Sequence, residues 1–267
     1  MPTWLAAGLW GLLGGGALVL GALVAWFVRV PQTVIASVMA FGSGVLISAV
    51  AFDLMAEAAE TGGLTATAVG FVGGALAYLA ANAALARHGA RHRKRSGNDP
   101  HEDQPSEQEQ SGSGAAIAIG ALLDGVPESV VLGLGLLGGG SVSTSVLAAV
   151  VISNVPEGLS SAAGMKRNGR SAGYVFGVWG GIAVASGLAA LLGYLALGDA
   201  PPEAVAVITA VAAGAILTMI ADTMIPEAFE RTRAWTGVIT TLGFLVASAI
   251  ERAWTCGRTA VPAGWAV

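Results

Sequence analysis

The stretch DGVPE (residues 124–128) stands in the middle of an apolar run that covers residues 115 to 138. A second stretch, SNVPEG (residues 153–158), stands in the middle of the next apolar run, residues 144 to 165. As a helix, each run is long enough to cross a hydrocarbon layer about 30 Å thick, which needs about 20 residues. Because charged side chains are costly at that depth, these stretches indicate membrane helices whose carboxylates have a specific role.

The composition of the whole chain supports a membrane protein. Of its 267 residues, 54% are hydrophobic and 11% are charged, whereas an ordinary soluble domain has roughly 25% charged residues. So few charges could not cover the surface of a soluble globular domain, which is therefore excluded. The basic cluster at residues 91–95 is short and is followed by acidic residues, so nucleic-acid binding has no support.

Apolar runs divide the chain into eight predicted spans, separated by Gly and Pro breaks such as residues 61–63, 138–140 and 201–202. We therefore predict an all-α polytopic membrane protein with eight transmembrane helices. Helices 1–3 occupy residues 1–86, a loop occupies 87–114, and helices 4–8 occupy 115–267. The predicted spans are 4–28, 34–57, 64–86, 115–138, 144–165, 171–197, 203–229 and 236–254.

Basic residues predict the orientation, because cytoplasmic loops collect Lys and Arg. With the N-terminus outside, the loops after helices 1, 3, 5 and 7 hold every Lys and Arg except Arg252 and Arg258. Both termini are thus expected outside the cytoplasm, in the cell (plasma) membrane. The loop at 87–114 is predicted to be a disordered cytoplasmic tether. The loop contains the three histidines of the chain, His88, His92 and His101. We interpret them as part of a solvated basic tail of helix 3, with a weak metal site as the alternative.

The two Pro-Glu stretches place oxygen ligands one helical turn apart. Asp124 and Glu128 have i, i+4 spacing, as do Ser153 and Glu157. Pro127 and Pro156 each remove a backbone donor, which leaves a carbonyl one turn earlier without its usual partner. Together with Asn154, these groups predict a polar chamber at mid-membrane. A chamber with two or three carboxylates suits a divalent cation.

A looser pair of acidic positions recurs in helices 2 and 7, namely Asp53 with Glu57 and Asp222 with Glu227. We predict these as a secondary metal site or pathway, while a solvated helix end is the alternative. For any single buried Glu, the alternative is a protonated side chain that links helices. The small-xxx-small pairs Gly70/Gly74 and Gly177/Gly181 predict close helix packing.

The repeated Pro-Glu helices resemble those of the ZIP family of zinc and iron (divalent metal) transporters, in which helices 4 and 5 typically read His-Asn-x-Pro-Glu. Eight helices, outside termini and a long loop after helix 3 agree with that family. The resemblance implies helices 4 and 5 at the centre of an inverted repeat. It implies Glu128 and Glu157 as shared metal ligands and Asn154 as a ligand of a second metal position. The chain is identified as a divergent member.

This chain departs from the family pattern at three ligand positions. Asp124 and Ser153 stand where His is usual, and Gly125 stands where the first Asn is usual. A glutamate often found on helix 6 has no counterpart, the nearest polar residue being Ser186. The predicted metal set is therefore Asp124, Glu128, Ser153, Asn154 and Glu157. Oxygen-only sites favour manganese, magnesium, calcium or ferrous iron over zinc.

The expected function is transport of a divalent metal cation, zinc or another first-row metal, by alternating access through the carboxylate site. Direction into the cytoplasm is implied by the resemblance alone. The alternatives are a proton-coupled carrier of a small organic solute and a non-transporting divergent homologue. No cofactor is expected. Enzymatic activity is not expected either, because no His lies in a predicted span to activate a serine. The expected partners are the metal ion as substrate, the lipid bilayer and, as an open alternative to a monomer, a second copy in a homodimer.

Overall fold

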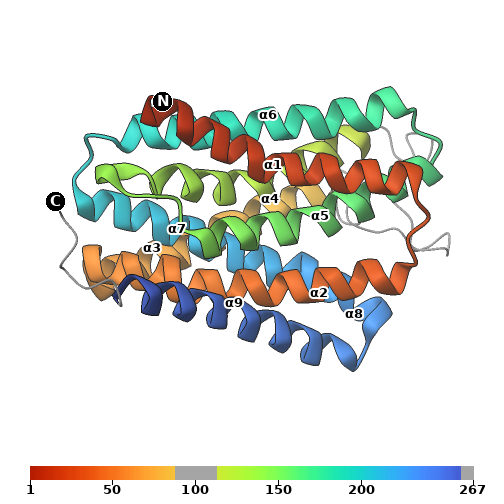
Figure 1. Cartoon of the computed structure of the whole chain (residues 1–267). Helices are drawn as coiled ribbons and strands as arrows, with labels where there is room; N and C mark the ends of the chain where they lie inside the picture. Colours follow the sequence, from red (N-terminus) through yellow and green to blue (C-terminus); the bar gives the residue numbers. More distant parts are fainter. Residues whose placement is uncertain (88–112, 260–267) are drawn as a thin grey trace.

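The computed structural model describes residues 1–87 and 113–259, and these residues form a bundle of long helices (Figure 1). No strand occurs within the described ranges. The all-α prediction is confirmed. The helices, with π-helical segments η1 and η4 and a short 3₁₀ segment η3, are α1 (Thr3–Phe27), α2 (Gln32–Ala49), η1 (Val50–Leu54), α3 (Met55–Ala86), α4 (Ser113–Leu134), η3 (Leu137–Gly139), α5 (Thr144–Arg167), α6 (Ala172–Leu197), α7 (Pro202–Met219), η4 (Ile220–Met224), α8 (Ile225–Thr232) and α9 (Trp235–Thr259).

The number of continuous helical stretches differs from the prediction. Over the described residues there are seven such stretches rather than eight, because the helices between Gln32 and Ala86 follow one another with a single non-helical residue, Gly63, between two of them. Within this stretch Gly63 has φ 75° and ψ 160°, which are not helical angles. A residue other than glycine would be strained there. The predicted break at residues 61–63 is thus a reversal of direction, but it has no loop of its own.

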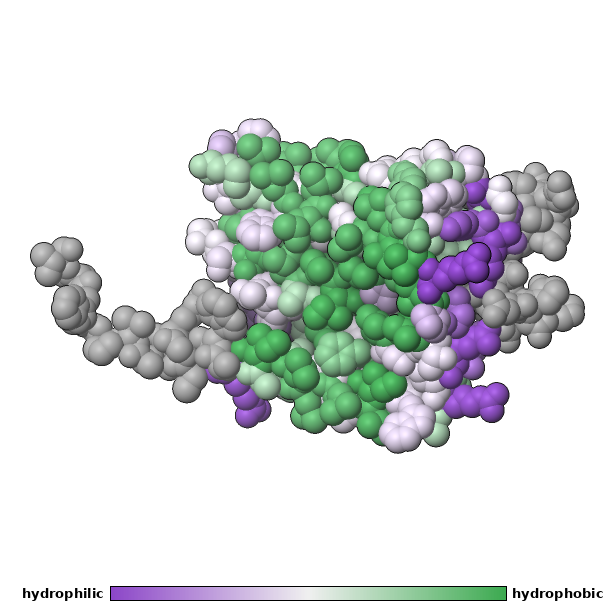
Figure 2. Space-filling model, turned by 45° about the vertical axis from the view of Figure 1, so that its right-hand side comes forward, coloured by the Kyte–Doolittle hydropathy of each residue, from purple (hydrophilic) through white to green (hydrophobic). Residues whose placement is uncertain are grey.

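The surface of the bundle is that expected for a protein embedded in a membrane. Within the described ranges, five helices are long and apolar enough to cross a bilayer: Thr3–Phe27, Gln32–Leu85, Thr144–Arg167, Ala172–Leu197 and Pro202–Thr232. Large apolar side chains such as Leu20, Leu76 and Leu192 are exposed along the sides of the bundle. Figure 2 shows apolar residues over the middle, a smaller hydrophilic group at one end, and most of the hydrophilic residues at the other.

That hydrophilic end is called the basic end here, and it is the end at which α1 finishes and α6 begins (Figure 1). The opposite end, at which α1 begins and α7 begins, is called the acidic end because Glu57, Glu60 and Glu203 lie there. The residues that define the basic end lie at or just beyond helix termini, and they are Arg29, Arg87, Lys166, Arg167, Arg170, Arg231 and Arg233.

Helix boundaries recur at a constant offset of 170 residues. Helix α2 and η1 begin at Gln32 and Val50, and α7 and η4 begin at Pro202 and Ile220. The positive-φ residue Gly63 corresponds in the same way to Arg233, which has φ 45°. Helix α1 runs from the acidic end to the basic end, whereas α6 runs back (Figure 1). The first set of helices, α1, α2 and η1, and the second set, α6, α7 and η4, therefore have closely similar lengths and opposite directions.

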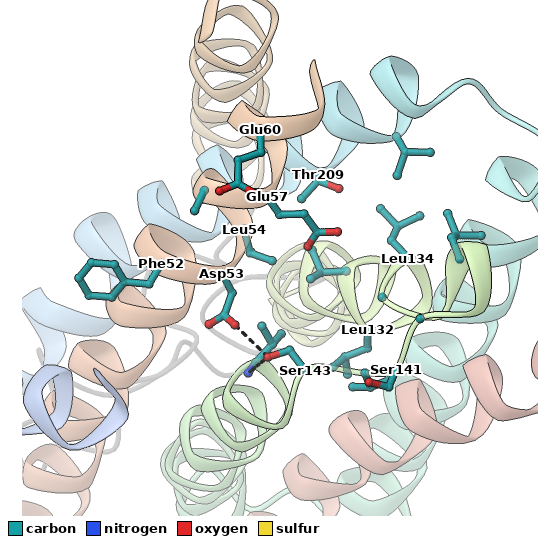
Figure 3. A pocket seen from close by; sticks show the side chains of 18 residues that line it. Phe52, Asp53, Leu54, Glu57, Glu60, Leu132, Leu134, Ser141, Ser143 and Thr209 are labelled. Atoms are coloured by element: carbon teal, nitrogen blue, oxygen red, sulfur yellow. Dashed lines mark hydrogen bonds between the residues drawn. The ribbon is translucent and has the colours of Figure 1, made fainter. Parts of the chain in front are cut away.

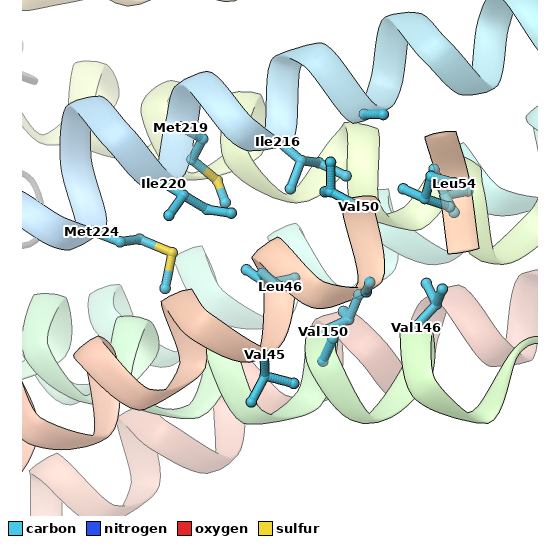
Figure 4. Packing of buried hydrophobic residues seen from close by; sticks show 14 of the residues in the cluster. Val45, Leu46, Val50, Leu54, Val146, Val150, Ile216, Met219, Ile220 and Met224 are labelled. Carbon is cyan, nitrogen blue, oxygen red and sulfur yellow. The ribbon is translucent and has the colours of Figure 1, made fainter. Parts of the chain in front are cut away.

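The central core joins the corresponding parts of the two sets. Leu46, Val50 and Leu54 of α2 and η1 are buried together with Ile216, Ile220 and Met224 of α7 and η4, each pair being separated by the same offset (Figure 4). Val146 and Val150 of α5 complete this part of the cluster. Burial of such side chains stabilises the contact between the two sets of helices, although the surrounding lipid reduces the hydrophobic contribution.

Glycines allow the closest helix contacts. A Cβ at Gly74 of α3 would lie 1.9 Å from the Val211 carbonyl oxygen of α7, and one at Gly70 would lie 2.9 Å from that of Val207. The packing role predicted for Gly70/Gly74 is confirmed. The same prediction is wrong, within the part of the chain that the structure describes, for Gly177 and Gly181: both are exposed, and an added Cβ at either has no described neighbour within 4 Å.

Candidate functional site

Helix α4 buries both carboxylates of the first Pro-Glu stretch. Asp124 and Glu128 are each only 2% exposed. The helix continues through Pro127, which cannot donate the backbone hydrogen bond normally accepted one turn earlier. The Tyr78 hydroxyl of α3 donates to Asp124 Oδ1 at 2.5 Å. A phenolic donor at this distance orients the Asp124 carboxylate.

Helix α5 buries the second stretch in the same manner. Ser153, Asn154 and Glu157 are all buried, Glu157 being 3% exposed. Ser153 Oγ donates to the Val150 carbonyl at 3.0 Å, and Asn154 Nδ2 donates to the Gly14 carbonyl of α1, also at 3.0 Å. The amide nitrogen of Asn154 is therefore used to hold α5 against α1.

The two Pro-Glu helices share neighbours at this level of the bundle. A Cβ at Gly14 of α1 would be 3.1 Å from both Leu132 of α4 and Val150 of α5. Gly42 of α2 lies against Ser153, since its added Cβ would be 3.2 Å from the Ser153 Cα. Glycines on α1 and α2 thus let both helices pack closely at the centre of the bundle, beside the buried polar groups.

The predicted metal ligands do not form a compact set of three carboxylates. Within residues 1–87 and 113–259, no three His, Cys, Asp or Glu side chains are grouped so that they could hold one metal ion. A cation at the centre would therefore need hydroxyl, amide or carbonyl oxygens beside the carboxylates. Such mixed oxygen sites are usual for hard divalent cations.

A separate cavity of ≈ 500 Å³ opens at the acidic end and contains one of the predicted secondary pairs (Figure 3). Asp53 and Glu57 line it, and Glu60, which was not predicted, joins them. Residues of α4, the segment before α5, and α7 form the other walls. Three acidic side chains on one wall make this cavity attractive to cations.

Two serines at the start of α5 hold the Asp53 carboxylate in place. Ser143 Oγ donates to Asp53 Oδ1 at 2.9 Å, and Ser145 Oγ donates to both carboxylate oxygens at 2.9 and 3.0 Å. Ser143 also caps α5 by accepting from the Val146 N–H. The stretch SVSTS (residues 141–145) is typical of a helix N-cap, but the sequence carries no signal for a contact with Asp53.

The other predicted pair lies in a different environment. Glu227 Oε1 accepts a hydrogen bond from Ser160 Oγ of α5 at 3.4 Å, whereas Asp222 is exposed on η4. With the offset of 170 residues, Glu57 corresponds to Glu227, but Asp53 corresponds to Thr223. The two acidic pairs are therefore equivalent at Glu57 and Glu227, whereas Asp222 lies one residue before the position that corresponds to Asp53.

The predicted loop lies for the most part outside the described residues, and so do its three histidines, His88, His92 and His101.

Tyr78→Phe is expected to destabilise the folded protein by about 1.5–3 kcal/mol, because it removes a donor to a buried carboxylate. The measurement is thermal unfolding of the purified protein in detergent. Tyr194→Phe is the matched control, since Tyr194 is half-buried on α6 and its substitution also deletes one hydroxyl. Equal effects of the two substitutions would contradict a special role for the Tyr78–Asp124 hydrogen bond.

Comparison of the chain with protein-family models gives no match, and comparison with curated proteins gives none either.

Proposed function

We propose that this protein transports a divalent metal cation across a membrane through buried carboxylates of α4 and α5. The observation that carries the proposal is the burial of Asp124, Glu128 and Glu157, each no more than 3% exposed, on two helices that each contain a proline. Carboxylates at this depth are costly unless they serve a bound or moving ion. The hydrogen bond from Tyr78 explains part of the burial of Asp124. A structural hydrogen bond of this kind does not explain why the Pro-Glu pattern occurs twice.

The proposed architecture has eight transmembrane helices in an inverted repeat, with α4 and α5 at its centre, as in the ZIP family. The reversal at Gly63 divides the stretch from Gln32 to Ala86 into two spans. The constant offset of 170 residues and the opposite directions of α1 and α6 support the repeat. Inverted repeats permit alternating access, because the two halves can exchange conformations around a central site.

The cavity at the acidic end is proposed as the outer approach to the site. The positive-inside rule assigns the basic end to the cytoplasm, so Asp53, Glu57 and Glu60 face the outside. Their negative charge raises the local concentration of cations. Inward transport is an expectation taken from the family resemblance.

The donor chemistry favours a hard or borderline ion. Carboxylate, hydroxyl and carbonyl oxygens suit manganese, magnesium, calcium or ferrous iron, whereas the imidazole that favours zinc has no representative among the proposed ligands. We expect manganese or ferrous iron to be transported faster than zinc.

The test is uptake by liposomes that contain the purified full-length protein. Each metal is presented separately, and the internal content is measured by elemental analysis after external metal has been removed. Metal accumulation above that of protein-free liposomes is the expected result. If no divalent metal entered, and a small organic solute entered with protons instead, the carrier alternative would replace metal transport.

Asp53→Asn is expected to raise the metal concentration for half-maximal uptake about fivefold with little change in the maximal rate. The reason is the loss of about 1 kcal/mol of attraction in a water-filled cavity. Concentration dependence of initial uptake is the measurement, and Glu203→Gln, an exposed acidic residue in the first turn of α7, is the control. A lower maximal rate with unchanged half-saturation would show that Asp53 acts in the transport step instead.

A further inference from the structure

A second cavity, of ≈ 490 Å³, lies at the basic end between the end of α1, the start of α2 and the end of α5. Its lining includes none of the proposed metal ligands, although Leu159 of the lining lies two residues after Glu157 on α5. Its charged lining residues are Arg29, Lys166 and Arg167. No Asp or Glu belongs to this lining, within the part of the chain that the structure describes. The cavity therefore suits an anion.

The structure holds one of these cations at the cavity wall. Lys166 Nζ donates to the Trp26 carbonyl at 2.5 Å, and it lies 5.2 Å from the centre of the Trp26 ring. Trp26 in turn packs edge-to-face on Phe176 of α6, with ring centres 5.8 Å apart. Lys166 is thus positioned by a backbone carbonyl and an aromatic ring, both of Trp26.

The start of α2 adds to the positive potential. Pro31 precedes the helix, and no side chain caps the helix N-terminus. Val30, Pro31 and Gln32 line the cavity, so the positive end of the α2 dipole faces it. A helix N-terminus beside three cations favours a phosphate group.

Apolar side chains beside the cavity distinguish a lipid from a free anion. Phe27 and Val28, at the end of α1, are 77% and 55% exposed, and Val28 lines the cavity. Trp26, near the end of α1, and Tyr174, near the start of α6, lie at the same end of the bundle as the cavity. Arg170 lies over the Tyr174 ring. Aromatic residues paired with cations are typical of the depth of lipid headgroups. Acyl chains could cover Phe27 and Val28 while the phosphate enters the cavity.

We infer that this cavity binds the headgroup of an anionic phospholipid in the cytoplasmic leaflet. The phosphate contacts Arg29, Lys166 and Arg167, and the acyl chains pack on Phe27 and Val28. Because the cavity lies between α1, α2 and α5, a bound lipid links three helices that belong to different parts of the bundle. This inference requires the membrane placement of the bundle but does not depend on metal transport.

The test is native mass spectrometry of the full-length protein in detergent with added phosphatidylglycerol or phosphatidylcholine of the same chain length. Phosphatidylglycerol is expected to bind at least about fivefold more tightly, and Arg29→Gln and Lys166→Gln are each expected to weaken it about fivefold. Arg87→Gln is the control, since Arg87 lies at the same end, at the end of α3, but does not line the cavity.

Arg29 is the decisive position because it lies exposed in the segment between α1 and α2, whereas Lys166, although also exposed, bonds to the Trp26 carbonyl of α1. Equal binding of the two lipids would overturn the inference, as would an Arg87→Gln effect as large as that of Arg29→Gln. Millimolar inorganic phosphate is the remaining probe. If it displaced phosphatidylglycerol completely, the cavity would be a site for a free anion and the lipid assignment would fall.

Discussion

Glu157→Gln and Glu128→Gln are each expected to lower metal uptake by at least about 100-fold. Groups that only support a metal ligand change affinity by as much as this, and the proposal makes these two carboxylates ligands. Glutamine keeps the length and shape of the side chain but cannot supply the negative charge that stabilises a divalent cation. Both positions are buried, so no nearby water can replace the lost charge in full.

The measurement is initial uptake into liposomes with the metal that the unaltered protein transports fastest. Glu203→Gln is the matched control because it removes the same charge from an exposed position on α7. Thermal unfolding of each variant must be recorded as well. If a folded Glu157→Gln protein transported at the normal rate, its carboxylate would be structural, as the alternative for single buried glutamates holds.

Gly74→Ala is expected to destabilise the folded protein by about 4 kcal/mol or more, beyond the usual cost of overpacking. The added Cβ would lie 1.9 Å from the Val211 carbonyl oxygen and 2.7 Å from its carbonyl carbon. Because these are backbone atoms, α3 and α7 must separate along their length to relieve the overlap. The close contact between the two helices would then be lost.

Gly73→Ala is the matched control for this substitution. Gly73 precedes Gly74 in the same helix, but an added Cβ there meets nothing within 4 Å in residues 1–87 and 113–259. Alanine is favoured over glycine in a helix by up to about 1 kcal/mol, so this variant should be as stable as the original protein or slightly more stable. Size-exclusion profiles and thermal unfolding in detergent compare the two. Similar unfolding temperatures would show that α3 and α7 are not in such close contact.

Secondary structure was largely predictable because membrane helices leave a strong local pattern. The predicted spans 144–165 and 171–197 agree closely with Thr144–Arg167 and Ala172–Leu197. The break near residues 61–63 was also predicted, and Gly63 provides it with φ 75°. The π-helical segments were not predicted, because a change in backbone hydrogen bonding has no signature in hydrophobicity.

The candidate site was predictable only in its residue types. Proline and carboxylate at fixed spacing identified Asp124, Glu128 and Glu157 as unusual, because a charge in an apolar run is costly wherever the helix lies. The Tyr78 hydrogen bond to Asp124 spans 46 residues, and the Ser145 bond to Asp53 spans 92. Neither contact is encoded by local spacing, so neither was found.

The all-helical architecture with long apolar helices, the carboxylates within those helices and the end of the bundle at which basic residues collect all followed from the sequence, since each depends on the composition of one segment at a time. Tertiary structure alone decided that Gly74 packs against α7, while Gly177 has no neighbour within 4 Å among the described residues. It also decided which acidic residues share a cavity with Ser143. These outcomes depend on how whole helices face one another, and that follows from the sum of many weak contacts along the entire chain.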